Sequence, residues 1–148
     1  MKIAFGCDHK GFILKQAILD FLAKEGHEVK DFGTYSTDSC DYPVFGRLVG
    51  KAVASGEFEL GVLVCGTGCG IGLAADRVKG IRAVCCSDPY TAQLSRNHNN
   101  ANVLAMGSMV VGEGLAIKIV EAFITSDFDG GRHLRRVNML NEMQADDE

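Results

Sequence analysis

Short apolar runs alternate along this chain with longer segments whose apolar residues recur at helical spacing. The runs cover residues 2–7, 27–32, 60–65, 80–86 and 102–107. Between the first two runs, Leu14, Ile18 and Leu22 are spaced four residues apart, so they share one face of a helix. Strands that alternate with helices form parallel neighbours joined by right-handed crossovers. The pattern therefore predicts an α/β fold, with a five-stranded parallel sheet between two layers of helices.

The third apolar run and the segments after the fifth run indicate which strand is central and how the chain ends. The third run, LGVLVC, is apolar throughout, which is typical of a central strand buried on both faces. After the fifth run, helical segments cover residues 114–125 and about 132–144. No strand follows the last helix, and we expect this extra C-terminal helix to pack on a partner subunit. At 148 residues the chain fits one domain, expected to span residues 1–148.

Charge and hydropathy exclude some classes of partner. The formal net charge is −4, whereas a general nucleic-acid binder neutralises many phosphates with clustered Lys and Arg. No apolar stretch approaches the ~20 residues that cross a bilayer, and the sequence has no signal-peptide pattern. We therefore expect a cytoplasmic protein that binds neither nucleic acid nor membrane.

Six cysteines occur in the sequence, and four of them lie within or beside the apolar runs. In a reducing compartment such positions predict buried thiols rather than disulfides. Cys65 and Cys69 lack the C-x-x-C spacing of a redox motif, and no second pair with zinc spacing follows. We expect no metal.

The segment CGTGCGIGLAA, residues 65–75, places glycines at positions 66, 68, 70 and 72. It is not a P-loop, because no lysine follows the loop. Gly70 to Ala75 formally matches G-x-G-x-x-A, with Asp88 as a candidate ribose ligand. A dinucleotide fingerprint normally opens the first strand–helix unit of a larger protein, whereas this one follows the third strand. Nicotinamide binding stays open as an alternative.

The alternate glycines favour a second interpretation of the same loop. They let consecutive backbone N–H groups converge on one point above the positive N-terminus of a helix. Such a loop forms an oxyanion hole or a phosphate site, and its field favours the thiolate form of a cysteine. Cys65 is then a nucleophile or a base, or else a small buried residue that ends a strand.

Further reactive and charged groups lie at the ends of the predicted elements. Asp8 and His9 follow the first run, and His98 precedes the fifth. Arg132 and Arg136 are four residues apart and share one face of the last helix. Singly, His98 fits a helix cap and the arginines fit a solvated surface. Together these groups supply an acid/base pair and a cationic cluster, which indicate an enzyme that acts on a small phosphorylated molecule.

Four motifs, KIAFGCDHKGF, CGTGCGIGLAA, RNHNNANVLAMGS and GGRHLRRV, run in this order over essentially the whole chain. In this order they resemble the ribose-5-phosphate isomerase B family, which includes the galactose-6-phosphate isomerase subunits. The resemblance implies a Rossmann-like αβα sandwich and an aldose–ketose isomerase that interconverts D-ribose 5-phosphate and D-ribulose 5-phosphate. It also implies a homodimer or dimer of dimers with active sites at the subunit interface, and no metal or organic cofactor.

The same resemblance assigns the chemistry to four side chains. Cys65 would be the base that moves a proton between C2 and C1 through an enediolate, and Thr67 would shuttle a proton between the two oxygens. His98, with Asp8 nearby, would open the furanose ring. Ile71 stands where some members of the family carry a glutamate base, so only the cysteine version is available here.

Other positions would bind the substrate according to the resemblance. Backbone N–H groups of the glycine loop would hold the oxyanion, an asparagine would bind sugar hydroxyls, and one histidine and two arginines would hold the phosphate. The oxyanion donors would be Gly66, Gly68 and Gly70, and the asparagine is Asn99. The phosphate ligands would be His9, Arg132 and Arg136.

Three departures from the family pattern bear on the choice of substrate. Met109 stands where many relatives carry an arginine of the phosphate site, which Arg135 could replace. Asp76 and Asn100 replace the more usual asparagine and aspartate. Two alternatives therefore stay open. One is a hexose-6-phosphate isomerase acting on allose or galactose 6-phosphate, and the other is a non-catalytic subunit that binds sugar phosphates.

Overall fold

The computed structural model describes residues 1–146, so residues 147–148 of the predicted domain lie outside the described residues. The strands are β1 (Lys2–Cys7), β2 (Glu28–Asp31), β3 (Leu60–Cys65), β4 (Ala83–Cys85) and β5 (Val103–Gly107). The helices are α1 (Phe12–Lys24), α2 (Tyr42–Ala54), α3 (Cys69–Asp76), α4 (Pro89–Asn99), α5 (Glu113–Ile124) and α6 (Arg132–Asp146). All five predicted strands and the two predicted final helices are found, with ends that differ from the prediction by at most three residues.

The five strands form one parallel sheet in the order β2-β1-β3-β5-β4. β3 lies at the centre, and all of its residues are buried, as its apolar run predicts. The register pairs Cys7 with Val64 and Cys65 with Gly107. The C-terminal ends of β1, β3 and β5 therefore lie side by side, at what we call the carboxyl edge of the sheet; the opposite side is the amino edge.

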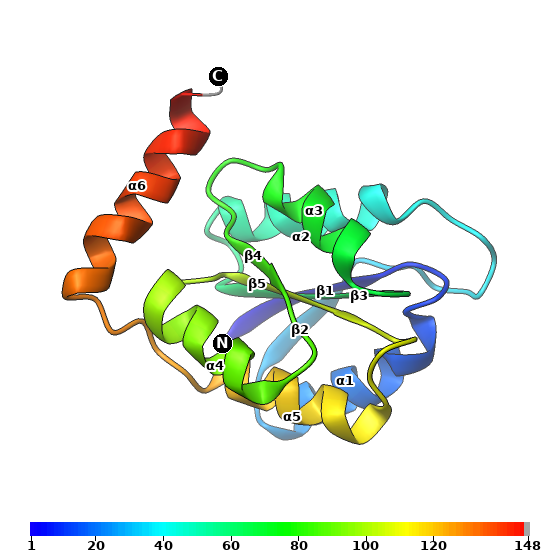
Figure 1. The fold of residues 1–148 in the computed structure, drawn as a ribbon. Helices are drawn as coiled ribbons and strands as arrows, with labels where there is room; N and C mark the ends of the chain where they lie inside the picture. Colours follow the sequence, from blue (N-terminus) through cyan, green and yellow to red (C-terminus); the bar gives the residue numbers. More distant parts are fainter. Residues whose placement is uncertain (147–148) are drawn as a thin grey trace.

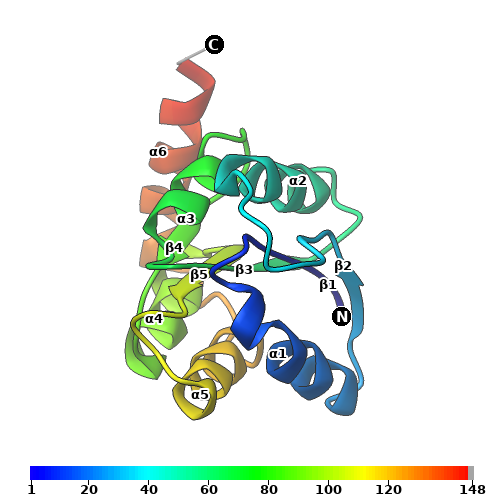
Figure 2. The ribbon, with the colours of Figure 1, turned by 90° about the vertical axis from the view of Figure 1, so that its right-hand side faces the viewer.

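Helices cover both faces of the sheet. α2 and α3 pack together on one face, and α1, α4 and α5 cover the other (Figures 1 and 2). Each face has its own apolar core: Ile18 and Phe123 belong to the first cluster, and Val49 and Ile71 to the second. The predicted three-layer αβα sandwich is confirmed.

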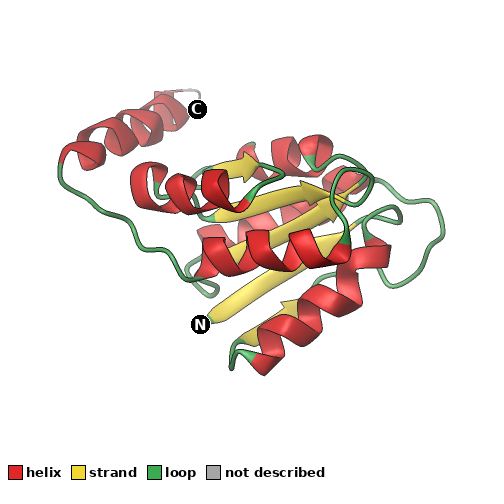
Figure 3. Cartoon of the chain, turned by 60° about the horizontal axis from the view of Figure 1, so that its bottom comes forward, coloured by secondary structure: helices red, strands yellow, loops and turns green. Residues whose placement is uncertain are grey.

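The last helix, α6, stands away from the layered body and follows α5 through the connection of residues 125–131 (Figures 1 and 3). Val137 is buried, but the side chains of Leu134, Leu140 and Met143 are 48%, 45% and 58% exposed. Near the C-terminal end of α6, the Gln144 side chain accepts the N–H of Gly80 and donates to the Ile81 carbonyl. The helix is thus attached to the body while much of its apolar surface faces outward, and its packing on a partner stays a prediction.

The cysteines differ in part from expectation. All six are free thiols, but of the four in or beside the apolar runs only Cys7 and Cys65 are buried. Cys85 is exposed and Cys86 is half-buried, so the prediction that they are buried is wrong. The reason is that β4 is a three-residue strand at the edge of the sheet, with β5 as its one paired neighbour. Within residues 1–146, no helix has the length and apolar character needed to span a bilayer.

Candidate active site

The loops that follow β1, β3 and β5 surround a cavity of about 480 Å³ at the carboxyl edge. Ligands of open parallel sheets bind at this edge, beyond the ends of the strands. Ten residues line the cavity: Asp8, His9, Lys10, Cys40, Tyr42, Cys65, Gly66, Thr67, Gly70 and Met109. Six of them were predicted site residues. Lys10, Cys40 and Tyr42 were missed, because residue type and spacing gave no signal that the chain brings them here.

Cys65 ends β3 and lies at the wall of this cavity with 5% of its surface exposed. Its Sγ accepts the backbone N–H of Gly68 at 3.1 Å. Gly68 precedes the first residue of α3 and has a φ of +87°, in the left-handed region that favours glycine. The chain therefore turns tightly around the sulfur, which lies beside the N-terminus of a helix, where negative charge is stabilised.

The space around this turn is too small for larger residues. A Cβ at Gly68 would lie 2.7 Å from the backbone carbon of Met106, and one at Gly70 would lie 2.6 Å from the Tyr42 ring. Gly70 and Ala75 both lie inside α3, rather than in a turn that would cradle a pyrophosphate. This geometry favours the oxyanion interpretation over the nicotinamide fingerprint.

Thr67 lies at the exposed tip of the glycine loop, where its Oγ1 accepts the N–H of Cys69 at 3.2 Å. The loop is fixed to the segment after β5, because the N–H of Ser108 donates to the Cys65 carbonyl and that of Met109 to the Gly66 carbonyl. The Met109 side chain is 72% exposed at the cavity rim. An uncharged group thus occupies the position where the family resemblance predicts an arginine.

Asp8 is 4% exposed, and its Oδ1 accepts the N–H groups of Lys10 and Gly11 at 3.0 and 2.9 Å. These bonds shape the turn after β1. Gly11 cannot carry a side chain there, since a Cβ would lie 2.2 Å from the Val64 carbonyl oxygen. Asp8 therefore both lines the cavity and holds its wall in place.

His9 is half-buried beside Asp8. Its Nδ1 accepts the backbone N–H of Cys40 at 3.3 Å, and the Cys40 sulfur lies 3.8 Å from the same nitrogen. A histidine whose Nδ1 accepts a hydrogen bond carries its proton on Nε2. The second nitrogen of His9 is therefore a donor, as a residue that binds a phosphate oxygen requires.

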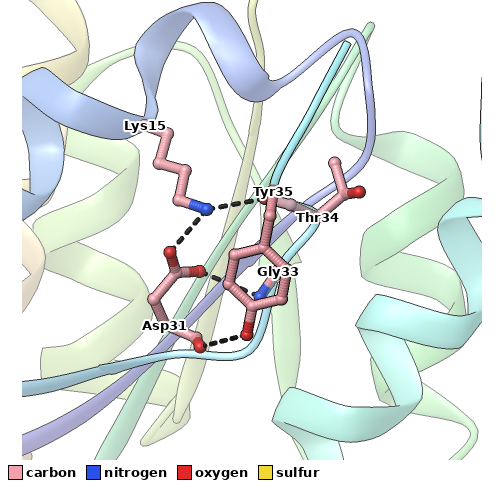
Figure 4. Close-up of polar contacts among 5 residues, drawn as sticks. All are labelled: Lys15, Asp31, Gly33, Thr34 and Tyr35. Carbon is pink, nitrogen blue, oxygen red and sulfur yellow. Dashed lines mark hydrogen bonds and ion pairs between the residues drawn. The ribbon is translucent and has the colours of Figure 1, made fainter. Parts of the chain in front are cut away.

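A partly buried ion pair between Lys15 and Asp31 holds the segment that leads to Cys40 (Figure 4). The Nζ of Lys15 lies 2.5 Å from Asp31 Oδ2 and donates to the Thr34 carbonyl at 2.6 Å. Asp31 also accepts the N–H of Gly33 through Oδ1 and the Tyr35 hydroxyl through its carbonyl. Lys15 is only 7% exposed. Its role was not predicted, because it occurs within an otherwise ordinary amphipathic helix.

The other predicted residues lie elsewhere in the chain. α4 starts after the C-terminal end of β4 and ends just before β5, so His98 and Asn99 lie at the amino edge. Arg132 and Arg136 lie on α6 and are exposed. Within one chain Asp8 and His98 therefore lie at opposite edges, because α4 runs antiparallel to the strands, and their approach in a site shared by two subunits stays a prediction. His9 is likewise separated from the two arginines.

At the amino edge, His98 stacks on His133 with 4.2 Å between ring centroids and 12° between ring planes. Burial lowers the pKa of His133, as do the charges of His98, Arg132 and Arg136, while Asp129 raises it. The ligand atoms of His98, Asp129 and His133 lie within 4.8 Å of one another. The lone pairs of nearly parallel rings do not converge on one point, so this cluster is not a preformed metal site.

The two remaining departures from the family pattern have structural roles. Asp76 Oδ1, at the end of α3, accepts the N–H of Ala83 at 3.1 Å. Asn100 caps α4 with a φ of +48°, a conformation that asparagine tolerates better than most residues. Its carbonyl accepts the Nε of Arg82 at 2.8 Å. Neither residue lines the cavity.

Comparisons with known proteins agree with this architecture. A family model described as Ribose/Galactose Isomerase matches residues 3–140. Ribose-5-phosphate isomerase B of Escherichia coli (strain K12) is 54% identical over 143 residues, which are 97% of this chain and 96% of that protein. The structure of Clostridium thermocellum ribose-5-phosphate isomerase B superposes with a TM-score of 0.98 at 50% identity and covers 100% of both chains.

A further similar structure contains a sugar phosphate. Ribose-5-phosphate isomerase B from Mycoplasma genitalium, solved with bound ribulose-5-phosphate, has a TM-score of 0.93 at 39% identity and covers 97% of this chain and 96% of its own. The family match and the identity over nearly the full length leave one conclusion. The chain belongs to the ribose/galactose isomerase family.

Proposed function

We propose that this chain is a single-domain aldose–ketose isomerase that interconverts D-ribose 5-phosphate and D-ribulose 5-phosphate. The observation that carries the proposal is Cys65, a buried thiol at the cavity wall inside a glycine turn at a helix N-terminus. The 54% identity to a ribose-5-phosphate isomerase B supports the same substrate. The ribulose-5-phosphate in a relative that covers 97% of this chain supports it further.

The proposed reaction moves one proton between neighbouring carbons. The thiolate of Cys65 takes the proton from C2 of the open-chain aldose and returns it to C1, while the Thr67 hydroxyl passes a proton from O2 to O1. An enediolate forms in between, and its negative charge needs donors. The N–H groups of the turn from Gly66 to Gly70, at the start of α3, are suited to this. Such donors typically contribute ~10²–10³ in rate each.

We further propose that two copies of the chain build each active site. The base at Cys65 lies at the carboxyl edge, whereas His98, Asn99, Arg132 and Arg136 lie beyond the amino edge or on α6. A two-fold related copy can bring its amino edge to this cavity, which forms two equivalent sites. The exposed apolar residues of α6 support such a contact.

In this assembly each chain contributes different groups to one sugar phosphate. The cavity supplies Cys65, Thr67, Asp8 and His9. The second copy supplies His98 to open the furanose with Asp8, Asn99 to bind hydroxyls, and Arg132 and Arg136 to hold the phosphate with His9. The phosphate is then bound between both chains, as bidentate Arg contacts and an imidazole N–H donor allow.

Met109 favours a second candidate substrate within the same reaction class. Its uncharged side chain at the cavity rim leaves one cation fewer than the family pattern provides, in a cavity of about 480 Å³. A hexose 6-phosphate places its phosphate one carbon farther from the reacting C1–C2 pair. Comparison of kcat/KM for ribose, allose and galactose phosphates decides between pentose and hexose.

The central experiment incubates the protein with ribose 5-phosphate in deuterated water. We expect ribulose 5-phosphate to form and deuterium to appear on the carbon that receives the proton. Binding of the sugar phosphate without ketose or label would instead indicate a non-catalytic binding subunit. Neither binding nor turnover with any phosphosugar would contradict the proposal altogether.

A further inference from the structure

The stack between His98 and His133 is not used by the mechanism above. We propose that His133 is a positioning residue: its imidazole, stacked 4.2 Å from that of His98 and nearly parallel to it, holds the His98 ring in the orientation that furanose opening needs. This inference rests on the proposed function and adds a residue to it. The motif GGRHLRRV contains His133 between the two arginines, but spacing alone did not indicate its contact with α4.

The backbone on either side of the stack is cross-linked. The N–H of Asp129 donates to the Asn97 carbonyl at 2.9 Å, and the Asn97 side chain donates to the Asp127 carbonyl at 2.7 Å. His133 itself donates its N–H to the Gly130 carbonyl. The end of α4 and the start of α6 therefore form one unit, although both rings are only half-buried. A half-buried ring on a helix end rotates freely unless a neighbour restricts it.

The charges around the pair suit proton transfer by His98. Burial lowers the pKa of His133, and the positive charges of His98, Arg132 and Arg136 lower it further, against the opposite effect of Asp129. These effects favour the neutral form of the His133 ring. A neutral ring face stabilises a cation stacked on it, so the contact persists while His98 carries a proton. Two charged rings would repel each other.

The substrate chemistry separates ring opening from the isomerisation itself. Ribose 5-phosphate is mostly a furanose, closed between C1 and the C4 oxygen. Ribulose 5-phosphate cannot form a furanose, because its C5 oxygen carries the phosphate. Exchange of a C1 hydrogen of the ketose with solvent needs the base and the oxyanion donors but no ring opening. A residue that acts only through His98 thus affects one reaction and spares the other.

The experiment compares His133→Leu, which removes the aromatic ring, with His133→Phe, which keeps a stacking ring. We expect His133→Leu to lower kcat for ribose 5-phosphate about tenfold, a modest part of what general acid–base catalysis contributes. His133→Phe is expected to stay within about threefold of the unmodified protein, since its ring still restricts His98. Deuterium exchange into saturating ribulose 5-phosphate should be unchanged in both. Asn138→Ala, an exposed position on the same helix, is the control for effects of altering α6.

Three outcomes would overturn the inference. Equal losses in the Phe and Leu variants would exclude stacking as the cause. A parallel loss of isomerisation and exchange would indicate a general structural role, and a wild-type rate in His133→Leu would remove any role. Absence of exchange in the unmodified protein would instead defeat the proposed function, and the inference with it, before any variant is made.

Discussion

The carboxyl edge and the amino edge of this sheet are built in opposite ways. At the carboxyl edge, Cys65 lies in a turn where no side chain fits at Gly68 or Gly107. At the amino edge, the candidate groups lie on helix ends and in a connection where Gly130 has no atom within 4 Å of an added Cβ. The first arrangement fixes a reacting atom by core packing. The second leaves binding groups on an exposed surface, where another molecule can complete their environment.

The sharpest way to break this comparison is to remove the sulfur. We expect Cys65→Ala to lower kcat by about a thousandfold, because a positioned base contributes ~10²–10⁴. Folding should persist, since the truncation removes one buried atom, with a loss of about 1 kcal/mol. Steady-state ketose formation and circular dichroism measure the two effects, with Cys86→Ala as the control thiol. A near-normal kcat in Cys65→Ala would mean that the base is elsewhere.

Mixing subunits tests whether the two edges meet only between chains. We expect Cys65→Ala and His98→Asn to be nearly inactive separately. When they are unfolded together and refolded, about a quarter of all sites should combine both intact groups, as random pairing in a two-fold dimer requires. Activity of the mixture is the measurement. A mixture no more active than its parents would place both groups in one chain.

A pair of glycine substitutions sharpens the contrast in packing. Both positions have positive φ, +87° at Gly68 and +65° at Gly130, so alanine costs about 1–2 kcal/mol at each. At Gly68 the new Cβ would also meet the Met106 backbone at 2.7 Å, which adds about 1–3 kcal/mol. Urea unfolding should therefore show a clearly larger loss for Gly68→Ala. Equal losses of unfolding free energy would mean that the carboxyl edge accommodates an added Cβ as easily as the amino edge does.

The arginines of α6 test the binding role given to the exposed region. Arg136→Ala should raise KM for ribose 5-phosphate about tenfold with a smaller change in kcat, because a phosphate contact is largely uniform binding. Its stability should not change, since the side chain is exposed. Arg135→Ala is the matched comparison: a similar rise in KM there would show that Arg135 replaces the cation missing at Met109. A fall in kcat with KM unchanged in Arg136→Ala would contradict a binding role.

The smallest effect concerns pH. Burial, then the charges of His98 and Arg132, lower the pKa of His133 from its ordinary value of 6.5. The unfolded chain therefore takes up a proton at this residue before the folded chain does, so the free energy of unfolding falls as pH drops below about 6.5. His133→Asn should lessen that fall between pH 7 and pH 5, measured by urea titration. An identical pH dependence in both proteins would contradict the assignment.

Much of the fold follows from the sequence because buried parallel strands leave strong local signals. The run LGVLVC predicts β3 correctly, and the glycines after it predict a tight turn beside Cys65. The insertion of β5 between β3 and β4 was not predictable, since local periodicity does not report which strands pair. The exposure of Cys85 follows from that same order.

The candidate site was predictable in its parts and not in its arrangement. His98 precedes the fifth run, and a residue before a parallel strand lies at the amino edge, so its separation from Asp8 had a signal in the sequence. Lys15 and Asp31 had none, because an ion pair between a helix and a strand end depends on how the layers pack. The stack of His133 on His98 likewise depends on how two elements pack, here α4 and α6, and local sequence does not report that contact.

The length of α4 has a consequence for how this protein behaves at low concentration. The helix has 11 residues and spans about 16 Å, so it carries His98 from the carboxyl edge, where it starts, to the amino edge. Under the proposed assembly, a lone chain holds a base and an acid that never reach the same sugar. Dilution then separates the two chains and removes the activity. The concentration at which specific activity halves reports how tightly two chains associate.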